Sequence, residues 1–142
     1  MALYHFSVRH VSRGKGQMVV ASAAYISGQR IYDGYYNKIH DYTSKSGVVF
    51  TEILTPEYVP ERMTDRETLW NEVEHVERNN KAQLAYSFDI ALQNELTLEE
   101  NIRLAKEFCQ EQFVARGMIV DLAVHEGKSE NEAVGTVIAE FG

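Results

Sequence analysis

Residues 1–8 of the chain read Met-Ala-Leu-Tyr-His-Phe-Ser-Val, and residues 12–28 read Ser-Arg-Gly-Lys-Gly-Gln-Met-Val-Val-Ala-Ser-Ala-Ala-Tyr-Ile-Ser-Gly. The first stretch alternates in side-chain character and predicts a strand over residues 3–10. The second begins as a basic, glycine-rich loop and continues as an alanine-rich segment that predicts a helix over residues 17–27. Gly28 ends this helix, because glycine readily adopts the left-handed conformation of a helix end.

Beyond this stretch the hydrophobic period switches between two and about 3.6 residues, which predicts further strands and helices. Two Thr-x-x-Glu sequences, starting at Thr64 and Thr97, predict helix starts with capping boxes. The predicted segments are a loop or irregular hairpin at 32–46, strands at 48–54, 84–93 and 118–125, a helix at 64–79, and a helix from Thr97 to Gly117. This order predicts one α+β domain over residues 1–142, with a central, largely antiparallel sheet flanked by helices.

Three of the predicted strands, at 3–10, 84–93 and 118–125, have one apolar face and one face of small or polar residues. The apolar faces include Tyr4, Phe6, Phe88, Ile90, Val120 and Leu122. We expect these side chains to be buried on one side of a shared sheet. The opposite faces carry His5, Ser7, Arg9, Ser87, Asp89, Asp121 and His125. If the strands are neighbours, this second set lines the floor of one cavity.

Charge is distributed unevenly along the chain. Residues 1–47 contain six Lys and Arg against two Asp and Glu, a net charge of +4, whereas residues 48–142 have a net charge of −11. An acidic body with a basic end can bind a phosphate backbone locally, with steep salt dependence; a solvated basic end without a partner is the alternative. No apolar run approaches the ~20 residues of a membrane span, and one cysteine excludes an internal disulfide. These features predict a cytoplasmic protein that does not bind membranes.

Tyr25 lies in the predicted helix directly after the basic glycine loop. This combination suits a phosphodiester transesterase, because a phenolate can attack phosphorus while neighbouring cations gather the phosphate. A tyrosine in an alanine-rich helix is also a common core residue. The residues alone leave both interpretations open.

Several separated motifs resemble the MobA/MobL relaxases, which are plasmid and transposon mobilization enzymes of the HUH endonuclease class. The motifs are the N-terminus and residues 14–17, 23–28, 40–43, 51–54 and 65–70. The similarity covers about residues 1–125, and residues 126–142 form a divergent or truncated tail. The resemblance implies the HUH relaxase fold, incomplete at its C-terminus, and DNA cleavage in conjugative plasmid transfer.

The resemblance also implies roles for single residues. Tyr25 matches the nucleophile, which attacks single-stranded DNA at a transfer origin and gives a 5′-phosphotyrosine and a free 3′-hydroxyl. His125 matches the first of three histidines that hold a divalent ion, Mg²⁺ or Mn²⁺. We expect Asp89 to orient a ligand or to assist proton transfer. The cations expected to hold phosphate are Arg9, Arg13, Lys15 and Arg30.

The other two implied ligands are a His-x-His pair preceded by Asn-Pro, and this pair is missing. Asn131 is followed by Glu-Ala-Val-Gly, although residues 133–141 remain apolar enough for a strand. Natural degeneration, a frameshift and truncation all fit this departure, and Asp89, Asp121 or Glu132 could partly substitute. Three hypotheses follow: an impaired relaxase fragment with accessory mobilization proteins as partners, a non-cleaving single-stranded DNA-binding module, or an inactive remnant whose acidic surface binds proteins.

Tyrosines cluster in the segment after the predicted nucleophile helix. They are Tyr32, Tyr35, Tyr36 and Tyr42, interleaved with Lys38 and Lys45. Such aromatic rings can stack on extruded bases beside phosphate-binding lysines. They can equally cover the core, and the sequence favours neither interpretation.

Overall fold

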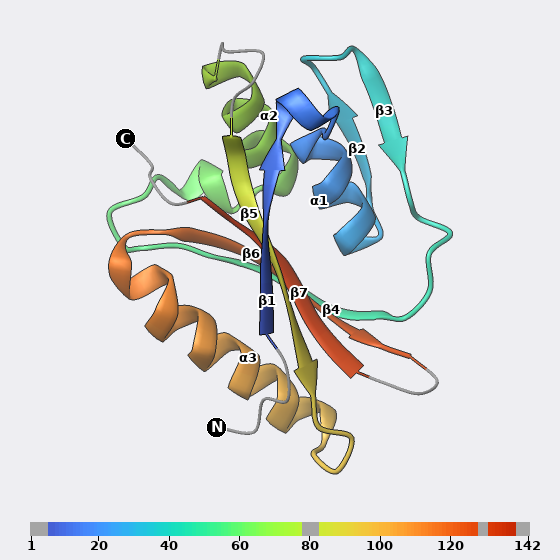
Figure 1. Ribbon diagram of the computed structural model, residues 1–142, viewed down its shortest axis with the longest axis vertical. Coiled ribbons are helices and arrows are strands. Elements are labelled where there is room, and N and C mark those ends of the chain that lie inside the picture. Colours follow the sequence, from blue (N-terminus) through green and yellow to red (C-terminus); the bar gives the residue numbers. More distant parts are fainter. Residues whose placement is uncertain (1–5, 78–82, 128–130, 139–142) are drawn as a thin grey trace.

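A computed structural model describes residues 6–77, 83–127 and 131–138 and has the predicted mixture of strands and helices (Figure 1). The strands are β1 (Phe6–Ser12), β2 (Arg30–Asp33), β3 (Lys38–Asp41), β4 (Val48–Leu54), β5 (Gln83–Leu92), β6 (Ile119–Glu126) and β7 (Asn131–Ile138). The helices are α1 (Val19–Ser27), α2 (Arg66–Val76) and α3 (Leu98–Gln112), with 3₁₀ turns at Arg13–Lys15, Glu61–Thr64 and Val114–Arg116. The predicted α+β class is confirmed.

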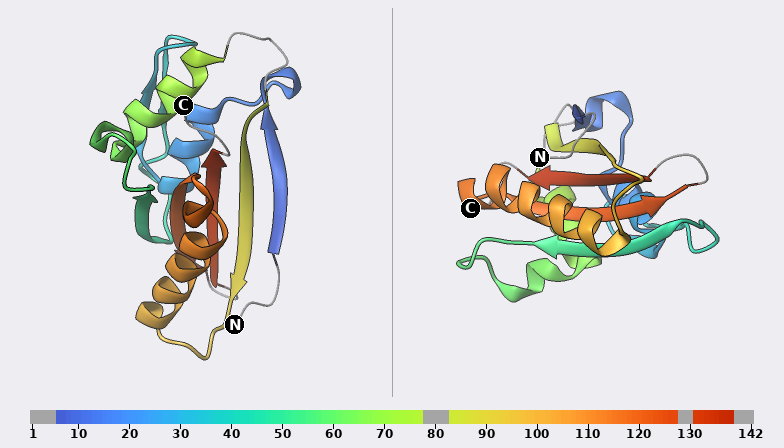
Figure 2. Two further views of the ribbon diagram at one scale, coloured as in Figure 1. Left: turned by 90° about the vertical axis from the view of Figure 1, so that its left-hand side faces the viewer. Right: turned by 90° about the horizontal axis from the view of Figure 1, so that it is seen from below.

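Five strands form one antiparallel sheet in the order β1-β5-β7-β6-β4. β7, the last described strand, therefore lies in the middle of the sheet, between β5 and β6. β1 and β4 are the two edges, and Figure 2 shows β1 as the outermost strand beside β5. This order brings the polar faces of β1, β5, β7 and β6 next to one another.

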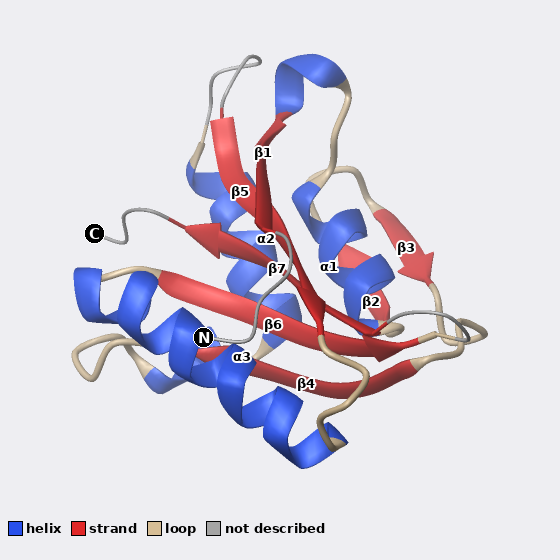
Figure 3. Ribbon diagram, turned by 60° about the horizontal axis from the view of Figure 1, so that its bottom comes forward, coloured by secondary structure: helices blue, strands red, loops and turns tan. Residues whose placement is uncertain are grey.

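The sheet is covered on both faces, with α3 on one face and α1 and α2 on the other (Figure 3). Even-numbered side chains of β6, such as Val120 and Leu122, pack in the core below α3, together with Phe88 and Ile90 of β5. Ile119 packs in the second core, which includes the buried face of α1 and Trp70 of α2. The strand alternation therefore predicted the faces of β5 and β6 correctly.

The edge strand β1 departs from this prediction. Phe6 lies on the α3 face, opposite Ile90 and with its ring 5.2 Å from that of Phe108, but it is 41% exposed. The prediction that Phe6 is buried is wrong, because an edge strand has a neighbour on one side alone. Tyr4 and His5 lie outside the described residues.

The two predicted capping boxes have different outcomes. At Thr97 the box is present: Thr97 Oγ1 accepts from the Glu100 N–H, and Glu100 Oε1 accepts from the Thr97 N–H. At Thr64 the prediction is wrong, because Asp65 caps α2 by accepting from the Thr68 N–H. The predicted helix end at residue 79 is also wrong, since α2 ends at Val76.

The segment at 32–46 contains a hairpin rather than a loop, because β2 pairs with β3 in a separate two-stranded sheet. Asp33 fixes its turn, with Oδ1 accepting from the Tyr35 and Tyr36 N–H groups and Oδ2 lying 2.9 Å from His40 Nε2. Asp33 is fully buried. No helix among the described residues is long and apolar enough to cross a membrane.

Candidate functional site

Helix α1 holds Tyr25 on its exposed side. The opposite stripe of the helix is buried in the core and consists of Val19, Val20, Ala23, Ala24 and Ser27. Tyr25 is 54% exposed, so it is not a core residue. The helix ends at Gly28, whose φ of 66° lies in the left-handed region. This confirms the predicted helix stop and places the phenol one turn before it.

Tyr25 lines a cavity of about 470 Å³ above the polar face of the sheet. The cavity collects side chains from β1, α1, β5, β6, β7 and the segment after β3. Its charged and titratable lining residues are Arg9, Tyr25, Lys45, Asp89, His125 and Glu132. Four residues of the predicted cavity floor or site, Arg9, Ser87, Asp89 and His125, therefore lie together beside Tyr25.

Asp89 is anchored by β1, because Ser7 lies opposite it in the strand register. Ser7 Oγ donates to Asp89 Oδ1 at 2.7 Å, and Arg9 Nη1 lies 3.5 Å from Asp89 Oδ2. The Arg9 side chain is 68% exposed at the edge of the cavity. The carboxylate is thus held in one orientation, while the guanidinium remains accessible to an anion.

His125 is oriented by the backbone of α1. Its Nε2 lies 2.9 Å from the Ile26 carbonyl oxygen, and because a carbonyl can only accept, Nε2 carries the proton. Nδ1 is then the nitrogen that faces the cavity, 3.6 Å from Oε1 of Glu132, its register partner on β7. A backbone carbonyl on the second ring nitrogen is the usual arrangement for a metal-ligating histidine.

Lys45 contacts Tyr25 in two ways. Its ammonium group lies 3.7 Å from the centroid of the Tyr25 ring and donates to the Tyr25 carbonyl oxygen at 2.8 Å. Burial lowers the pKa of Lys45, and the Glu132 carboxylate offsets part of this effect. The edge of the ring packs against Tyr42, with centroids 5.2 Å apart and an interplanar angle of 89°. Nothing in the local sequence around Lys45 indicates this contact, which joins residues twenty positions apart.

Comparison with known sequences decides the family: a sequence model of the MobA/MobL family matches residues 17–139. The chain belongs to the MobA/MobL family. The conjugal transfer protein TraA of Rhizobium radiobacter is 38% identical over 136 residues, which cover 89% of this chain and 12% of TraA. The mobilization protein MobL of Acidithiobacillus ferridurans is 34% identical over 125 residues, which cover 88% of this chain and 32% of MobL. The chain thus spans 12% and 32% of the length of these two relatives.

A solved structure, reported as "Molecular Basis of Vancomycin Resistance Transfer in Staphylococcus aureus", has the same fold with a TM-score of 0.90. It is 38% identical to this MobA/MobL chain, and the match covers 96% of this chain and 70% of that one. The relaxase-like fold that the resemblance implied is confirmed.

The side chains of this MobA/MobL chain do not fit a three-histidine ion site. Glu132 and Val134 lie on the cavity side of β7, opposite His125 and Ala123 of β6. They occupy two positions at the spacing of a His-x-His pair, but one is a carboxylate and the other is apolar. Among the described residues no three His, Cys, Asp or Glu side chains are grouped closely enough to hold a metal ion.

Asp121 also does not contribute to the cavity. Its carboxylate is buried below α2, where it accepts from Arg66 Nε and Nη2 and from Trp70 Nε1 at 2.7–2.9 Å. The prediction that Asp121 lies on the cavity floor is wrong. The alternation correctly predicted the face of the sheet on which Asp121 lies. The contact of its carboxylate is determined by Arg66, which lies on α2.

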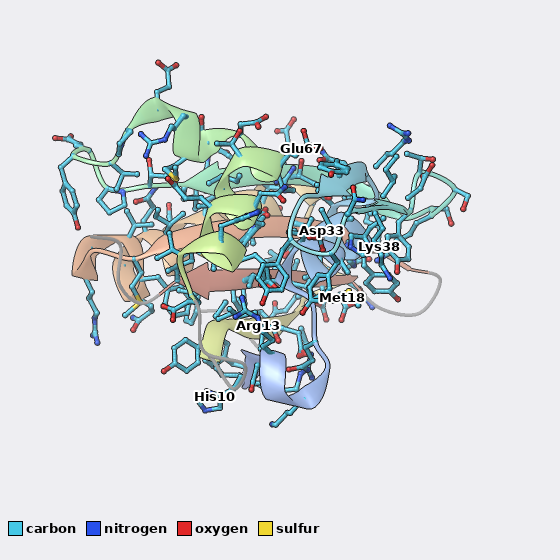
Figure 4. The ribbon with its side chains drawn as sticks, turned by 90° about the horizontal axis from the view of Figure 1, so that it is seen from above. His10, Arg13, Met18, Asp33, Lys38 and Glu67 are labelled. Carbon is cyan, nitrogen blue, oxygen red and sulfur yellow. The ribbon has the colours of Figure 1, made fainter. Side chains whose placement is uncertain are left out.

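Three of the four predicted phosphate-binding cations lie away from the cavity. Arg13 is buried, and Figure 4 shows it at the end of α2, where it donates to the carbonyls of Glu74 and Glu77. A cation at this position satisfies carbonyl groups that a helix end leaves without intrahelical partners. Lys15 is exposed in the turn that follows β1, and Arg30 lies 3.9 Å from Asp41 on the hairpin. Arg9 is the predicted cation that lines the cavity.

Proposed function

We propose that this chain is a DNA relaxase fragment for conjugative mobilization. In this proposal Tyr25 attacks a phosphodiester of single-stranded DNA at a transfer origin and forms a 5′-phosphotyrosine adduct. The observation that carries the proposal is the exposed Tyr25 phenol in one cavity with Arg9, Lys45, Asp89 and His125. The names of the relatives, conjugal transfer and mobilization proteins, support a DNA substrate of this kind.

The proposed reaction is a balanced transesterification at phosphorus. The phenol oxygen of Tyr25 forms a bond to phosphorus, the bond to the 3′-oxygen breaks, and the leaving oxygen takes up a proton. Arg9 and Lys45 would hold the negative phosphate oxygens, which is how fixed cations lower the barrier of such a step. Asp89, which Ser7 orients and which lines the same cavity, would accept the phenol proton.

We further propose that cleavage by this chain is strongly impaired. His125 presents Nδ1 to the cavity and would be one ligand of a divalent ion, Mg²⁺ or Mn²⁺, but Glu132 and Val134 do not complete a set of ligands around it. A single lost electrostatic contact at a reacting oxygen commonly costs about 10²–10³ in rate. Without a bound divalent ion, Arg9 and Lys45 would compensate part of the negative charge on the phosphate.

A second candidate function is binding of single-stranded DNA without cleavage. It is favoured by the Glu132 carboxylate, which occupies the position opposite His125. Under this function the cavity still gathers a phosphate through Arg9 and Lys45, while Tyr25 contacts the strand without attacking it. Under both functions the proposed partners of the chain are single-stranded DNA at a transfer origin and accessory mobilization proteins. The proposed location is the cytoplasm.

The test measures binding and covalent chemistry separately. Fluorescence anisotropy should show tighter binding to an oligothymidine of about 15 nucleotides than to the matched duplex, with affinity falling steeply as NaCl rises. Arg9→Ala should weaken binding, whereas Arg103→Ala, which removes an exposed cation from α3, should not. Equal affinity for duplex and single strand would contradict both candidate functions.

Covalent chemistry is tested with a labelled single-stranded library of random sequence. The protein is incubated with the library and Mn²⁺, denatured, and examined for label that stays with the protein on a denaturing gel. A weak adduct that disappears in Tyr25→Phe supports the impaired relaxase. Strand binding without any adduct supports the non-cleaving module, and an adduct that persists in Tyr25→Phe contradicts the assignment of the nucleophile.

A further inference from the structure

A second cavity, of about 410 Å³, also has Tyr25 in its lining. It is lined by Gly16, Gln17, Met18, Ala21, Ser22, Tyr25, Lys38, His40 and Tyr42. Gln17, Ser22 and Tyr25 line both cavities. The two cavities therefore adjoin beside α1, and Tyr25 is part of the wall of each.

The walls of this second cavity follow from two periodicities. Met18, the N-cap of α1, is followed within the helix by Ala21, Ser22 and Tyr25; the spacing i, i+3, i+4 and i+7 puts them on one face. On the hairpin side, Lys38, His40 and Tyr42 alternate along and just beyond β3, so they share one face of the extended chain. Figure 4 shows Met18 and Lys38 on the same side of the molecule, as their shared cavity requires.

The hairpin wall is held firmly in place. His40 is buried and bound through Nε2 to the fully buried Asp33 carboxylate at 2.9 Å. Asn71 of α2 donates to the Tyr32 carbonyl and accepts from the Gly34 N–H, which ties the hairpin to the helix. These contacts fix the position of the hairpin wall, and a fixed wall reduces the entropy lost on binding.

The lining combines apolar surface with a cation. Met18, Ala21 and the Tyr42 ring supply apolar and aromatic contacts, and the exposed ammonium group of Lys38 stands at the edge. An aromatic surface beside a lysine is the chemistry that binds a base together with its backbone phosphate. The volume also falls within the ~300–1,000 Å³ range of ligand-binding cavities.

We infer that this second cavity binds a nucleotide of single-stranded DNA adjacent to the phosphate at Tyr25. The inference rests on the proposed function. A phosphodiester joins two nucleosides, so a phosphate held at Tyr25 places one nucleoside on each side of that ring. The cavity with His125 receives one nucleoside, and the cavity with Lys38 and Tyr42 receives the other, with Lys38 on the next phosphate.

Two variants test this nucleotide site by anisotropy with the same oligothymidine. Ala21→Trp fills the second cavity and leaves the lining of the first unchanged; we expect affinity to fall about tenfold, the effect of losing one stacked base. Lys38→Glu should weaken binding, and Lys38→Ala should lower the slope of log affinity against log salt by about one. The matched controls are Ala115→Trp and Arg103→Ala, at exposed positions outside both cavities.

The outcomes separate this inference from the proposed function. If Arg9→Ala weakens binding while Ala21→Trp and both Lys38 variants bind like the unmodified protein, the nucleotide site is overturned and the proposed function stands. If the unmodified protein does not prefer single strands, both fall together. Should Ala21→Trp fail to fold by circular dichroism, the exposed Lys38 variants still decide.

Crosslinking gives a second readout on the unmodified chain. An oligonucleotide of 5-iodo-deoxyuridine is irradiated in complex with the protein, and crosslinked peptides are identified by mass spectrometry. Crosslinks at Met18 or Tyr42 support the second site. Crosslinks confined to other parts of the chain overturn it.

Discussion

At the scale of single residues, Lys45 is the side chain that links the segment after the hairpin to Tyr25, the candidate nucleophile. Its ammonium group is shared between the face of the Tyr25 ring and the Tyr25 carbonyl near the end of α1. Both contacts favour a cation, since the ring face and a helix carboxyl end each carry partial negative charge. Lys45 therefore sets the position of the ring and supplies charge to the cavity.

Replacing Lys45 tests this double role. We expect Lys45→Ala to lower the affinity for single-stranded DNA and to reduce the salt slope by about one. Lys45→Arg should recover most of the affinity, because it keeps the charge and the contact with the ring. Anisotropy titrations between low and high NaCl measure both quantities. An unchanged salt slope in Lys45→Ala would show that Lys45 holds the ring without contacting phosphate.

Arg13 should affect stability rather than DNA binding. Its guanidinium is buried, donates to two carbonyls at the end of α2 and lies 3.4 Å from the Glu74 carboxylate. Removing one partner of a buried ion pair commonly costs about 3–5 kcal/mol, so Arg13→Ala should unfold at a markedly lower urea concentration. Lys15→Ala, two residues away in the exposed turn, should change the free energy of unfolding by less than about 0.5 kcal/mol. Similar midpoints for both variants would contradict the buried role of Arg13.

At the scale of elements, the start of α2 shows how two overlapping capping motifs are resolved. Thr64 with Glu67, and Asp65 with Thr68, are both spaced for a helix start. Asp65 accepts from the Thr68 N–H, while Thr64 donates to the Glu61 carbonyl and closes the preceding turn. Glu67 accepts instead from the Tyr32 N–H of β2. The partner of Glu67 lies 35 residues away, which a local motif does not indicate.

Asp65 provides a test through pH. Hydrogen bonds from Thr68, first its hydroxyl and then its N–H, hold the pKa of Asp65 below its usual value of 3.8. The carboxylate therefore stabilises the fold above the unfolded-state pKa, and this contribution is lost as pH falls through the lower folded-state pKa. Asp65→Ala should cost ~1 kcal/mol near neutral pH.

Asp65→Asn is the matched control, since asparagine also caps helices but does not ionise. It should keep most of the stability at neutral pH and flatten its dependence on pH. Urea unfolding between about pH 3 and pH 7 measures this. A pH profile identical to that of the unmodified chain would show that Asp65 is not linked to folding.

At the scale of the whole molecule, the features that depend on the hydrophobic period of the sequence were predicted. The side-chain contacts between elements far apart in the sequence were not. Alternation predicted the buried faces of β5 and β6, β4 matches the strand predicted at 48–54, and the glycine after α1 predicted the end of that helix. Of the cavity lining, the positions of Arg9, Ser87, Asp89 and His125 were predicted. The roles of Arg13 and Asp121 were not, because each is determined by a charge on another element, Glu74 or Arg66.

The last prediction follows from the strand register and concerns the cavity that β1, β5, β6 and β7 line with Tyr25. The polar face that carries His125 continues on β7 through Glu132 and Val134, the register partners of His125 and Ala123. Both positions line the cavity with Tyr25. Histidines at 132 and 134 would point to the same side as His125, because alternate residues of a strand share a face. Together they would make the three-nitrogen set that a divalent ion can use.

The variant carrying Glu132→His and Val134→His should therefore bind Mn²⁺ more tightly than the unmodified chain in calorimetry. It should also form more covalent adduct with the single-stranded library, since a fixed cation stabilises charge on the phosphate and the leaving oxygen. Adding Tyr25→Phe should abolish the adduct and leave Mn²⁺ binding intact, because in the proposed function the phenol acts as the nucleophile and not as a ligand. A Glu132→Gln and Val134→Ala variant removes the native side chains without adding imidazoles, and its Mn²⁺ affinity should not rise. If the folded histidine variant binds Mn²⁺ no better than this control, the face shared by β6 and β7 is not the place of the ion.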